Sequence, residues 1–192
     1  MLRDDRIAEL GRELKGQIEI FGGCEVELSP EGLTPFWADP QSCAVNAGRY
    51  VLVEAPRYGF ATALETALPG LAALEMQPIL VHPERLRPDE LAIAVDANRD
   101  GLLLQVTAAA LTSGLSTRIG RAAWRLLERG LVDFVASDAH DSTRRPPDLA
   151  AAFQMTAARV GPSAAADLFV WNPLAVLSSD RTSATASATS GR

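Results

Sequence analysis

Residues 78–85 read Pro-Ile-Leu-Val-His-Pro-Glu-Arg, a short apolar run that ends in a histidine. Four other apolar runs occur along the chain, and each of the five is typical of a buried strand. Helical patterns separate most of them, and this alternation predicts parallel βαβ units. The predicted strands cover residues 18–28, Tyr50–Glu54, 78–81, 101–106 and 132–136.

The helical patterns lie between and after these runs. Leucines recur every three or four residues from position 64 to 74, but Pro69 and Gly70 predict a break into two pieces. A second helix is predicted over 121–128, with Gly130 as its C-cap. Further helices are predicted over 147–159 and 163–168, and Asn172-Pro173 is expected to end a helix.

Length and composition predict one domain with an appended tail. The chain has 192 residues, which suits a single domain over residues 1–177. Residues 178–192 are rich in Ser, Thr and Ala without periodicity, so they are predicted to be disordered. Acidic residues outnumber basic ones by 24 to 18 and no basic run occurs, which argues against a nucleic-acid partner.

The cellular context follows from the cysteines and the N-terminus. Cys24 and Cys43 have no metal-type spacing and are too few for a disulfide framework, so both are expected to be reduced. The first 14 residues are charged and lack the apolar core of a signal peptide. No apolar run has the length of a membrane span. We therefore expect a cytoplasmic protein without membrane insertion.

Polar side chains recur at the predicted strand ends with a regular spacing. The step from Glu25 to Glu54 is 29 residues, that from Glu54 to His82 is 28, and that from His82 to Asp138 is 56. One βα unit of a barrel takes about 30 residues, so one such group occurs per unit with one unit skipped. His140 follows Asp138 at the spacing that puts two strand residues on the same face.

Carboxylates and imidazoles that converge at one barrel mouth are typical metal ligands. A histidine or glutamate at a strand end is more often structural when it occurs alone. Five such groups that recur with the same spacing favour a metal or catalytic site. The mixed oxygen and nitrogen donors, without a thiolate, suit manganese, iron or zinc better than a soft metal. Arg85 and Arg145 lie beside these groups in the sequence, and guanidinium groups clamp phosphate in a bidentate way. Any single arginine is more often a surface loop residue.

These segments together resemble the PHP (polymerase and histidinol phosphatase) family, and within it the metal-dependent tyrosine phosphatases of capsule and exopolysaccharide synthesis. The matching pieces are Gly-Cys-Glu-Val at 23–26, Tyr-Val-Leu-Val-Glu-Ala-Pro at 50–56, residues 78–85, Gln-Val-Thr at 105–107, Ala-Ser-Asp-Ala-His at 136–140, Arg-Pro-Pro at 145–147 and Asn172-Pro173. The resemblance covers about residues 5 to 177. The segments 78–85 and 136–147 are specific only in combination.

The resemblance implies a distorted (β/α)7 barrel with up to three metals, most often manganese, with iron, zinc or magnesium as alternatives. It also implies removal of phosphate from the tyrosine-rich tail of a capsule-regulating kinase. Glu25, Glu54 and His82 would share one metal site, Asp138 and His140 would bind further metals, and Arg85 and Arg145 would bind the phosphate. Water or hydroxide on the metals would attack phosphorus.

The chain departs from the family pattern at its start. The His-x-His motif of the first strand and the Thr-Pro-His of the second do not occur, so we expect a barrel without its first two βα units. Both a late start and a natural truncation explain this departure. Two other functions stay open: a catalytically inactive fragment, and a PHP phosphoesterase acting on a small phosphate monoester.

Overall fold

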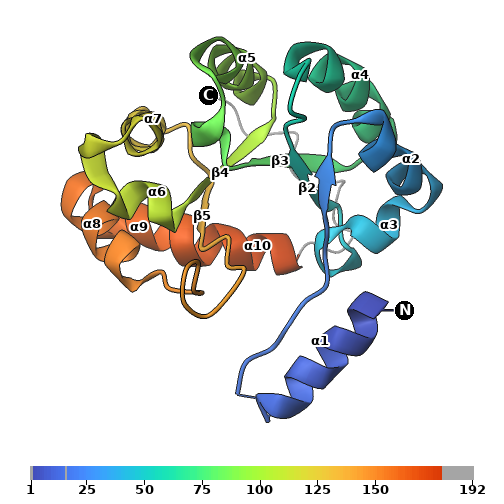
Figure 1. Cartoon of the computed structure of the whole chain (residues 1–192), viewed down its shortest axis with the longest axis horizontal. Coiled ribbons are helices and arrows are strands. Elements are labelled where there is room, and N and C mark those ends of the chain that lie inside the picture. The colour runs from blue at the N-terminus through green and yellow to red at the C-terminus, as the bar shows by residue number, and fades with distance from the viewer. Residues whose placement is uncertain (1, 16, 179–192) are drawn as a thin grey trace, which may run out of the picture.

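A computed structural model describes residues 2–15 and 17–178 (Figure 1). Five strands form one parallel sheet in the order β1-β2-β3-β4-β5, as the alternating pattern predicts. The strands are β1 (Glu25–Glu27), β2 (Tyr50–Glu54), β3 (Gln77–Val81), β4 (Leu103–Thr107) and β5 (Phe134–Ala136). Within the described residues the sheet is open, and β1 and β5 form its two edges.

The first strand is much shorter than the predicted range 18–28. The backbone N–H of Cys24 donates to the carbonyl oxygen of Cys43, and that of Asn46 donates to Gly22, at 3.0 and 2.8 Å. The chain before Glu25 therefore bonds to the loop ahead of β2 rather than to β2 itself. The regular ladder starts only at Glu25, whose Cα is in register with that of Leu52.

Ten α-helices, three short 3-10 turns and one π-helical turn are described. The α-helices are α1 (Leu2–Glu13), α2 (Pro30–Ala38), α3 (Pro40–Cys43), α4 (Phe60–Ala73), α5 (Pro88–Arg99), α6 (Ala108–Thr112), α7 (Arg118–Glu128), α8 (Ala150–Val160), α9 (Pro162–Ala166) and α10 (Asn172–Ser178). The 3-10 turns are η1 (Val45–Ala47), η2 (Pro83–Arg85) and η3 (Gly114–Ser116), and the π-helical turn is η4 (Asp167–Trp171). Figure 1 shows α1 standing apart from the sheet and its helices.

The predicted break at Pro69 and Gly70 is wrong, because α4 runs through both residues. Its buried face includes Leu64 and Leu71, and the burial of this face offsets the hydrogen bond that proline cannot donate. Gly70 has a packing role instead: a Cβ at this position would lie 2.9 Å from the Trp37 ring. The glycine therefore allows close contact between α4 and α2.

The predicted end of a helix at Asn172-Pro173 is also wrong, since α10 begins there. Proline is well tolerated in a first helical turn. The Asn172 side-chain amide donates to the carbonyl oxygen of Asp133 at 2.8 Å, which ties the start of α10 to β5. The predicted disordered tail, 178–192, lies outside the described residues except for Ser178, which ends α10.

The two faces of the sheet bury different cores. The larger core joins alternate strand residues such as Val53, Leu80 and Val106 to the surrounding helices. On the opposite face, Ile79 and Phe134 pack with Val176 of α10 in a smaller cluster. Both faces are therefore covered, as expected for a parallel sheet. Among the described residues, no helix combines the length and apolar character needed to cross a membrane.

Candidate metal centre

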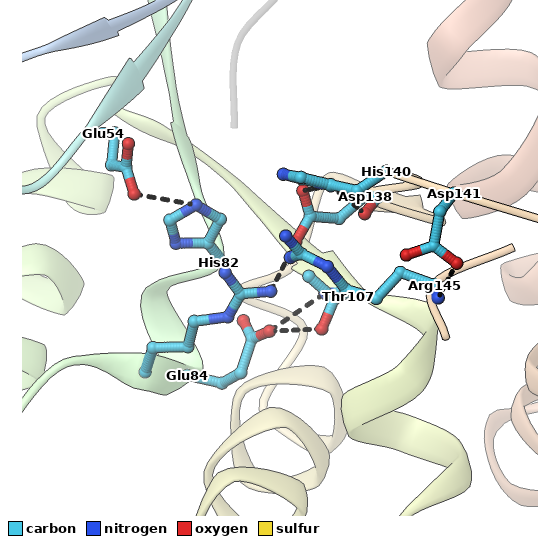
Figure 2. A network of polar contacts seen from close by, with 9 residues as sticks. Glu54, His82, Glu84, Thr107, Asp138, His140, Asp141 and Arg145 are labelled. Carbon is cyan, nitrogen blue, oxygen red and sulfur yellow. Dashed lines mark hydrogen bonds and ion pairs between the residues drawn. The ribbon is translucent and has the colours of Figure 1, made fainter. Parts of the chain in front are cut away.

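The carboxyl ends of β2 and β3, together with β1, bring Glu25, Glu54 and His82 together. One ligand atom from each lies within 4.8 Å of the others. Figure 2 shows the Glu54 carboxylate pointing at the His82 ring, where Oε1 is 3.4 Å from Nε2. Glu54 ends β2 and His82 follows β3, as predicted. The predicted place of Glu25 at a strand end is wrong, because Glu25 begins β1 and is in register with Leu52 rather than Glu54, so only its side chain reaches the cluster.

His82 has an uncommon backbone conformation at the end of β3. Its φ is +39°, in the left-handed region that residues other than glycine rarely adopt. Its N–H donates to the carbonyl oxygen of Gln105 at 2.8 Å, extending the β3–β4 ladder, and Pro83 then begins η2. Asp138, after β5, also has a positive φ of +53°. Such strained residues tend to occur at functional sites.

The protonation of this cluster suits a cation. Burial, followed by the charge of Arg85, lowers the pKa of His82 to about 4, so its ring is neutral near pH 7 and has a free lone pair. Partial desolvation raises the pKa of Glu25, and the negative charges of Asp138 and Glu54 raise it further. A divalent cation would relieve this crowding of carboxylates.

The donor set fits a divalent metal. Two carboxylates and one neutral imidazole are hard and borderline donors of the kind that manganese, iron and zinc accept. A cavity of about 270 Å³ lies beside them, with Glu54, His82 and Arg85 in its lining. This volume leaves room for solvent or a phosphoryl group next to the three donors.

Arg85 and Arg145 meet on a single carboxylate. Oδ2 of Asp138 accepts from Arg85 Nη2 at 2.5 Å and from Arg145 Nη1 at 2.9 Å. The Asp138 side chain is only 5% exposed, whereas the arginine side chains are 38% and 39% exposed. Asp138 therefore holds two partly exposed guanidinium groups side by side.

The loop that carries Arg145 is organised by Asp141 (Figure 2). Its Oδ1 accepts the backbone N–H groups of Thr143, Arg144 and Arg145 at 2.8, 2.5 and 3.4 Å. The bond from Arg144, followed by that from Thr143, lowers the pKa of Asp141 to about 2. The loop closes further where the N–H of His140 donates to the carbonyl oxygen of Arg145 at 3.0 Å.

Two residues of the site were not predicted from the sequence. Glu84 of η2 is fully buried, and its Oε1 accepts from both the hydroxyl and the backbone N–H of Thr107, at 2.7 and 3.1 Å (Figure 2). Burial raises the pKa of Glu84. The signal in the sequence was an acid only three residues after the apolar run of β3, flanked by a proline and a candidate arginine.

The structure brings together only part of the predicted ligand set. Within the described residues, the cluster contains Glu25, Glu54 and His82 but not Asp138 or His140. His140 has a side chain 54% exposed, and its Nδ1 lies 3.7 Å from Oδ1 of Asp138. The metal-binding roles of Asp138 and His140, and the phosphate-binding roles of the arginines, stay predictions.

The chain is similar to several curated tyrosine-protein phosphatases. It is 30% identical over 104 residues to the putative tyrosine-protein phosphatase CapC of Staphylococcus aureus, a match that covers 53% of this chain and 41% of that protein. It is 24% identical over 185 residues to CpsB of Streptococcus pneumoniae, covering 90% and 73%. It is 29% identical over 140 residues to YwqE of Bacillus subtilis, covering 69% of this chain and 50% of that protein. The chain thus spans about two fifths to three quarters of these relatives.

The fold matches a solved structure from the pair YwqE of Bacillus subtilis and CpsB of Streptococcus pneumoniae, described as unique metal-dependent tyrosine phosphatases. The TM-score is 0.81 at 23% identity, covering 92% of this chain and 72% of the other. The model of the CpsB/CapC family of capsular polysaccharide synthesis matches residues 3–178. This chain therefore belongs to the CpsB/CapC family.

Proposed function

We propose that this chain is a metal-dependent phosphoesterase that hydrolyses phosphotyrosine. The observation that carries the proposal is the approach of Glu25, Glu54 and His82 to within 4.8 Å, beside two exposed guanidinium groups. The names of the related phosphatases support the same reaction class.

In this proposal Glu25, Glu54 and His82 bind a divalent metal, with manganese as the first candidate. Asp138 and His140 contribute to further metal binding on the opposite side of the site. A bound divalent cation supplies positive charge for the phosphoryl oxygens and lowers the pKa of a coordinated water. The neutral His82 ring can donate its lone pair without first losing a proton.

Arg85 and Arg145 then bind the phosphoryl oxygens. Both guanidinium groups are fixed by Asp138, so their remaining N–H groups need little reordering to meet an anion. As negative charge shifts onto the phosphoryl and leaving oxygens, these donors stabilise it. Asp138 acts here on the arginines, as a positioning residue as well as a predicted ligand.

The proposed substrate is the phosphotyrosine tail of a bacterial tyrosine kinase that regulates capsule or exopolysaccharide synthesis, and the proposed location is the cytoplasm. Membership in a capsular polysaccharide synthesis family supports this choice. Small phosphate monoesters such as histidinol phosphate are the competing substrate class, and a direct comparison of turnover separates the two.

The proposed complete fold is a distorted seven-stranded barrel in which two further βα units lie beside β1. Among the described residues β1 pairs only with β2, and Glu25 and Glu27 are exposed at this edge. Reading the in-frame DNA ahead of Met1 tests the idea. A His-x-His and a Thr-Pro-His in that reading supports it, and an in-frame stop without them counts against it.

The metal site is tested by titrating manganese calorimetrically into the wild type, Glu25→Gln and Glu27→Gln. Glu27 is a matched control, because it lies on the same strand, is exposed and is outside the cluster. We expect Glu25→Gln to weaken binding at least about tenfold, as one of three ligands loses its charge. Equal binding by all three proteins rules out this site.

Catalysis is tested with a phosphotyrosine peptide in saturating manganese. Arg85→Lys keeps the charge but loses the planar fork, so we expect lower kcat or higher KM at unchanged manganese affinity. Wild-type turnover by Arg85→Lys would contradict the phosphate clamp. Absence of turnover in the wild type despite bound manganese would identify this chain as a metal-binding but inactive protein.

A further inference from the structure

A basic groove lies between α5 and α7, the two helices that flank β4 in Figure 1. Its volume is about 460 Å³. Five arginines line it: Arg99 from α5, Arg118, Arg121 and Arg125 from α7, and Arg129 just beyond α7. All five are exposed. The proposed function uses none of them.

The charge of this groove opposes that of the whole chain. The chain has a net charge of −6, yet the lining has five arginines and a single acid, Asp96. Asp96 pairs with Arg99 at 3.2 Å. Among the described residues, Arg125 and Arg129 form no ion pair with a carboxylate. The groove therefore offers several positive charges to an external anion.

The floor of the groove is apolar. Val95 and Leu126 at its base are already buried, but Leu91 and Ala122 are half-buried and Ala92 is exposed, so apolar surface lies among the arginines. An occupant that covers this floor needs apolar side chains between its negative charges. A peptide meets that requirement, whereas a nucleic acid or an acidic polysaccharide has no aliphatic side chains to place there.

The groove is joined to the metal centre by Arg118. Its guanidinium donates to the carbonyl oxygen of Leu86 at 2.8 Å and to that of Arg85 at 3.1 Å. Leu86 lines both the groove and the cavity beside Glu54 and His82. The groove and the cavity therefore adjoin at Leu86, so a peptide bound at the metal centre lies next to the groove.

The dimensions fit a short extended peptide. Arg118 to Arg129 spans 11 residues of helix and its C-cap region, or about 16 Å at 1.5 Å per residue. An extended peptide covers this length with about five residues at roughly 3.3 Å each. Three alternate positions of such a peptide point to the same side, so up to three acidic side chains can face the arginines.

We infer that this groove docks an acidic peptide segment, with apolar residues between its acids, that flanks the phosphotyrosine of the substrate. The presence of a phosphotyrosine in the bound peptide rests on the proposed function. The acidic character of the flanking segment rests on the groove alone. It assigns substrate preference to residues outside the metal centre. Acidic flanks lower KM, while kcat on a small aryl phosphate is independent of the groove.

The test uses a fluorescent peptide of alternating Glu and Leu around one tyrosine, unphosphorylated for binding and phosphorylated for turnover. Arg125→Glu/Arg129→Glu is compared with Arg12→Glu/Lys15→Glu, which makes the same charge change at exposed residues of the α1 region. We expect the groove variant to weaken binding by roughly tenfold or more and the control to bind as wild type. Arg125→Gln/Arg129→Gln should weaken peptide binding less than the charge-reversed variant does. It replaces that variant in the test if the charge reversal prevents folding.

Binding that weakens in the groove variant only, and that is lost when the peptide acids become Gln, supports the inference. Equal peptide binding by the groove variant and the control overturns it. Tighter groove-dependent binding of heparin or an oligonucleotide than of the peptide also overturns it. Groove-dependent binding without phosphotyrosine hydrolysis overturns the proposed function and leaves the docking surface supported.

Discussion

The hydroxyl of Thr107 is the main side-chain partner of a fully buried carboxylate. It donates to Oε1 of Glu84 at 2.7 Å, and the backbone N–H of Thr107 donates to the same atom at 3.1 Å. Oε2 of Glu84 is buried without a hydrogen-bond partner among the described residues. Thr107→Val keeps the shape of the side chain and removes the hydroxyl. Only the backbone bond to Glu84 then remains.

The expected cost of Thr107→Val is about 1–3 kcal/mol of unfolding free energy, the range for leaving a buried acceptor under-satisfied. The upper part of the range applies if Glu84 is ionised, because hydrogen bonds to charged groups are stronger. With a urea slope of roughly 1–3 kcal/mol/M, a loss of 2 kcal/mol lowers the midpoint by about 1 M. Urea unfolding followed by circular dichroism measures this shift.

Thr156→Val is the matched control. Thr156 is also fully buried, but its hydroxyl has no hydrogen-bond partner in the described part of the chain. Removing that hydroxyl relieves an uncompensated burial, so we expect unchanged or slightly higher stability. If both variants lower the urea midpoint by the same amount, the Glu84 bond has no special role and the reasoning fails.

Two further predictions concern stability. Asp133 accepts the Leu104 N–H at 2.8 Å, and burial raises its pKa. Its contribution to the free energy of unfolding is therefore fully present below its ordinary pKa and is lost as pH rises through the raised value. Asp133→Asn keeps an acceptor oxygen but does not titrate. Its free energy of unfolding relative to the wild type, measured by urea unfolding, should therefore rise between about pH 4 and about pH 7. A difference that stays constant with pH contradicts this. A Cβ at Gly120 would overlap the Gly114 carbonyl oxygen, whereas one at Gly11 meets nothing within 4 Å. Gly120→Ala should therefore lower the free energy of unfolding by about 1–3 kcal/mol, and Gly11→Ala should raise it by up to about 1 kcal/mol, as measured by thermal unfolding. Similar melting temperatures for the two variants would refute the packing argument.

Much of the sheet could be predicted because strand identity is a local property. The run Tyr50–Glu54 forms β2 with the predicted bounds, since its first four residues are apolar and three of them have strong strand propensity. Gly130, with a φ of +66°, follows α7 as predicted. The break at Pro69 failed for the opposite reason: tertiary packing of α4 outweighed a local helix-breaking signal.

The sequence by itself determined which residues could form the metal centre. A period of about one βα unit puts Glu54 and His82 at the carboxyl edge of a parallel sheet, whatever the helices do. Glu25 begins β1, level with Leu52, and joins them through its side chain. That argument needs only strand order and chain length per unit, which the sequence carries directly. The gathering of these three side chains within 4.8 Å agrees with it.

Only the tertiary structure decided which side chains are partners. Asp138 pairs with Arg85, 53 residues away, and with Arg145 across a local loop, and the basic groove joins α5 to α7. Such contacts depend on helix packing and loop geometry to within about 1 Å, because hydrogen bonds and ion pairs weaken steeply with distance. Periodicity fixes the edge of the sheet at which a residue lies, but the packing of distant elements fixes what its side chain meets there.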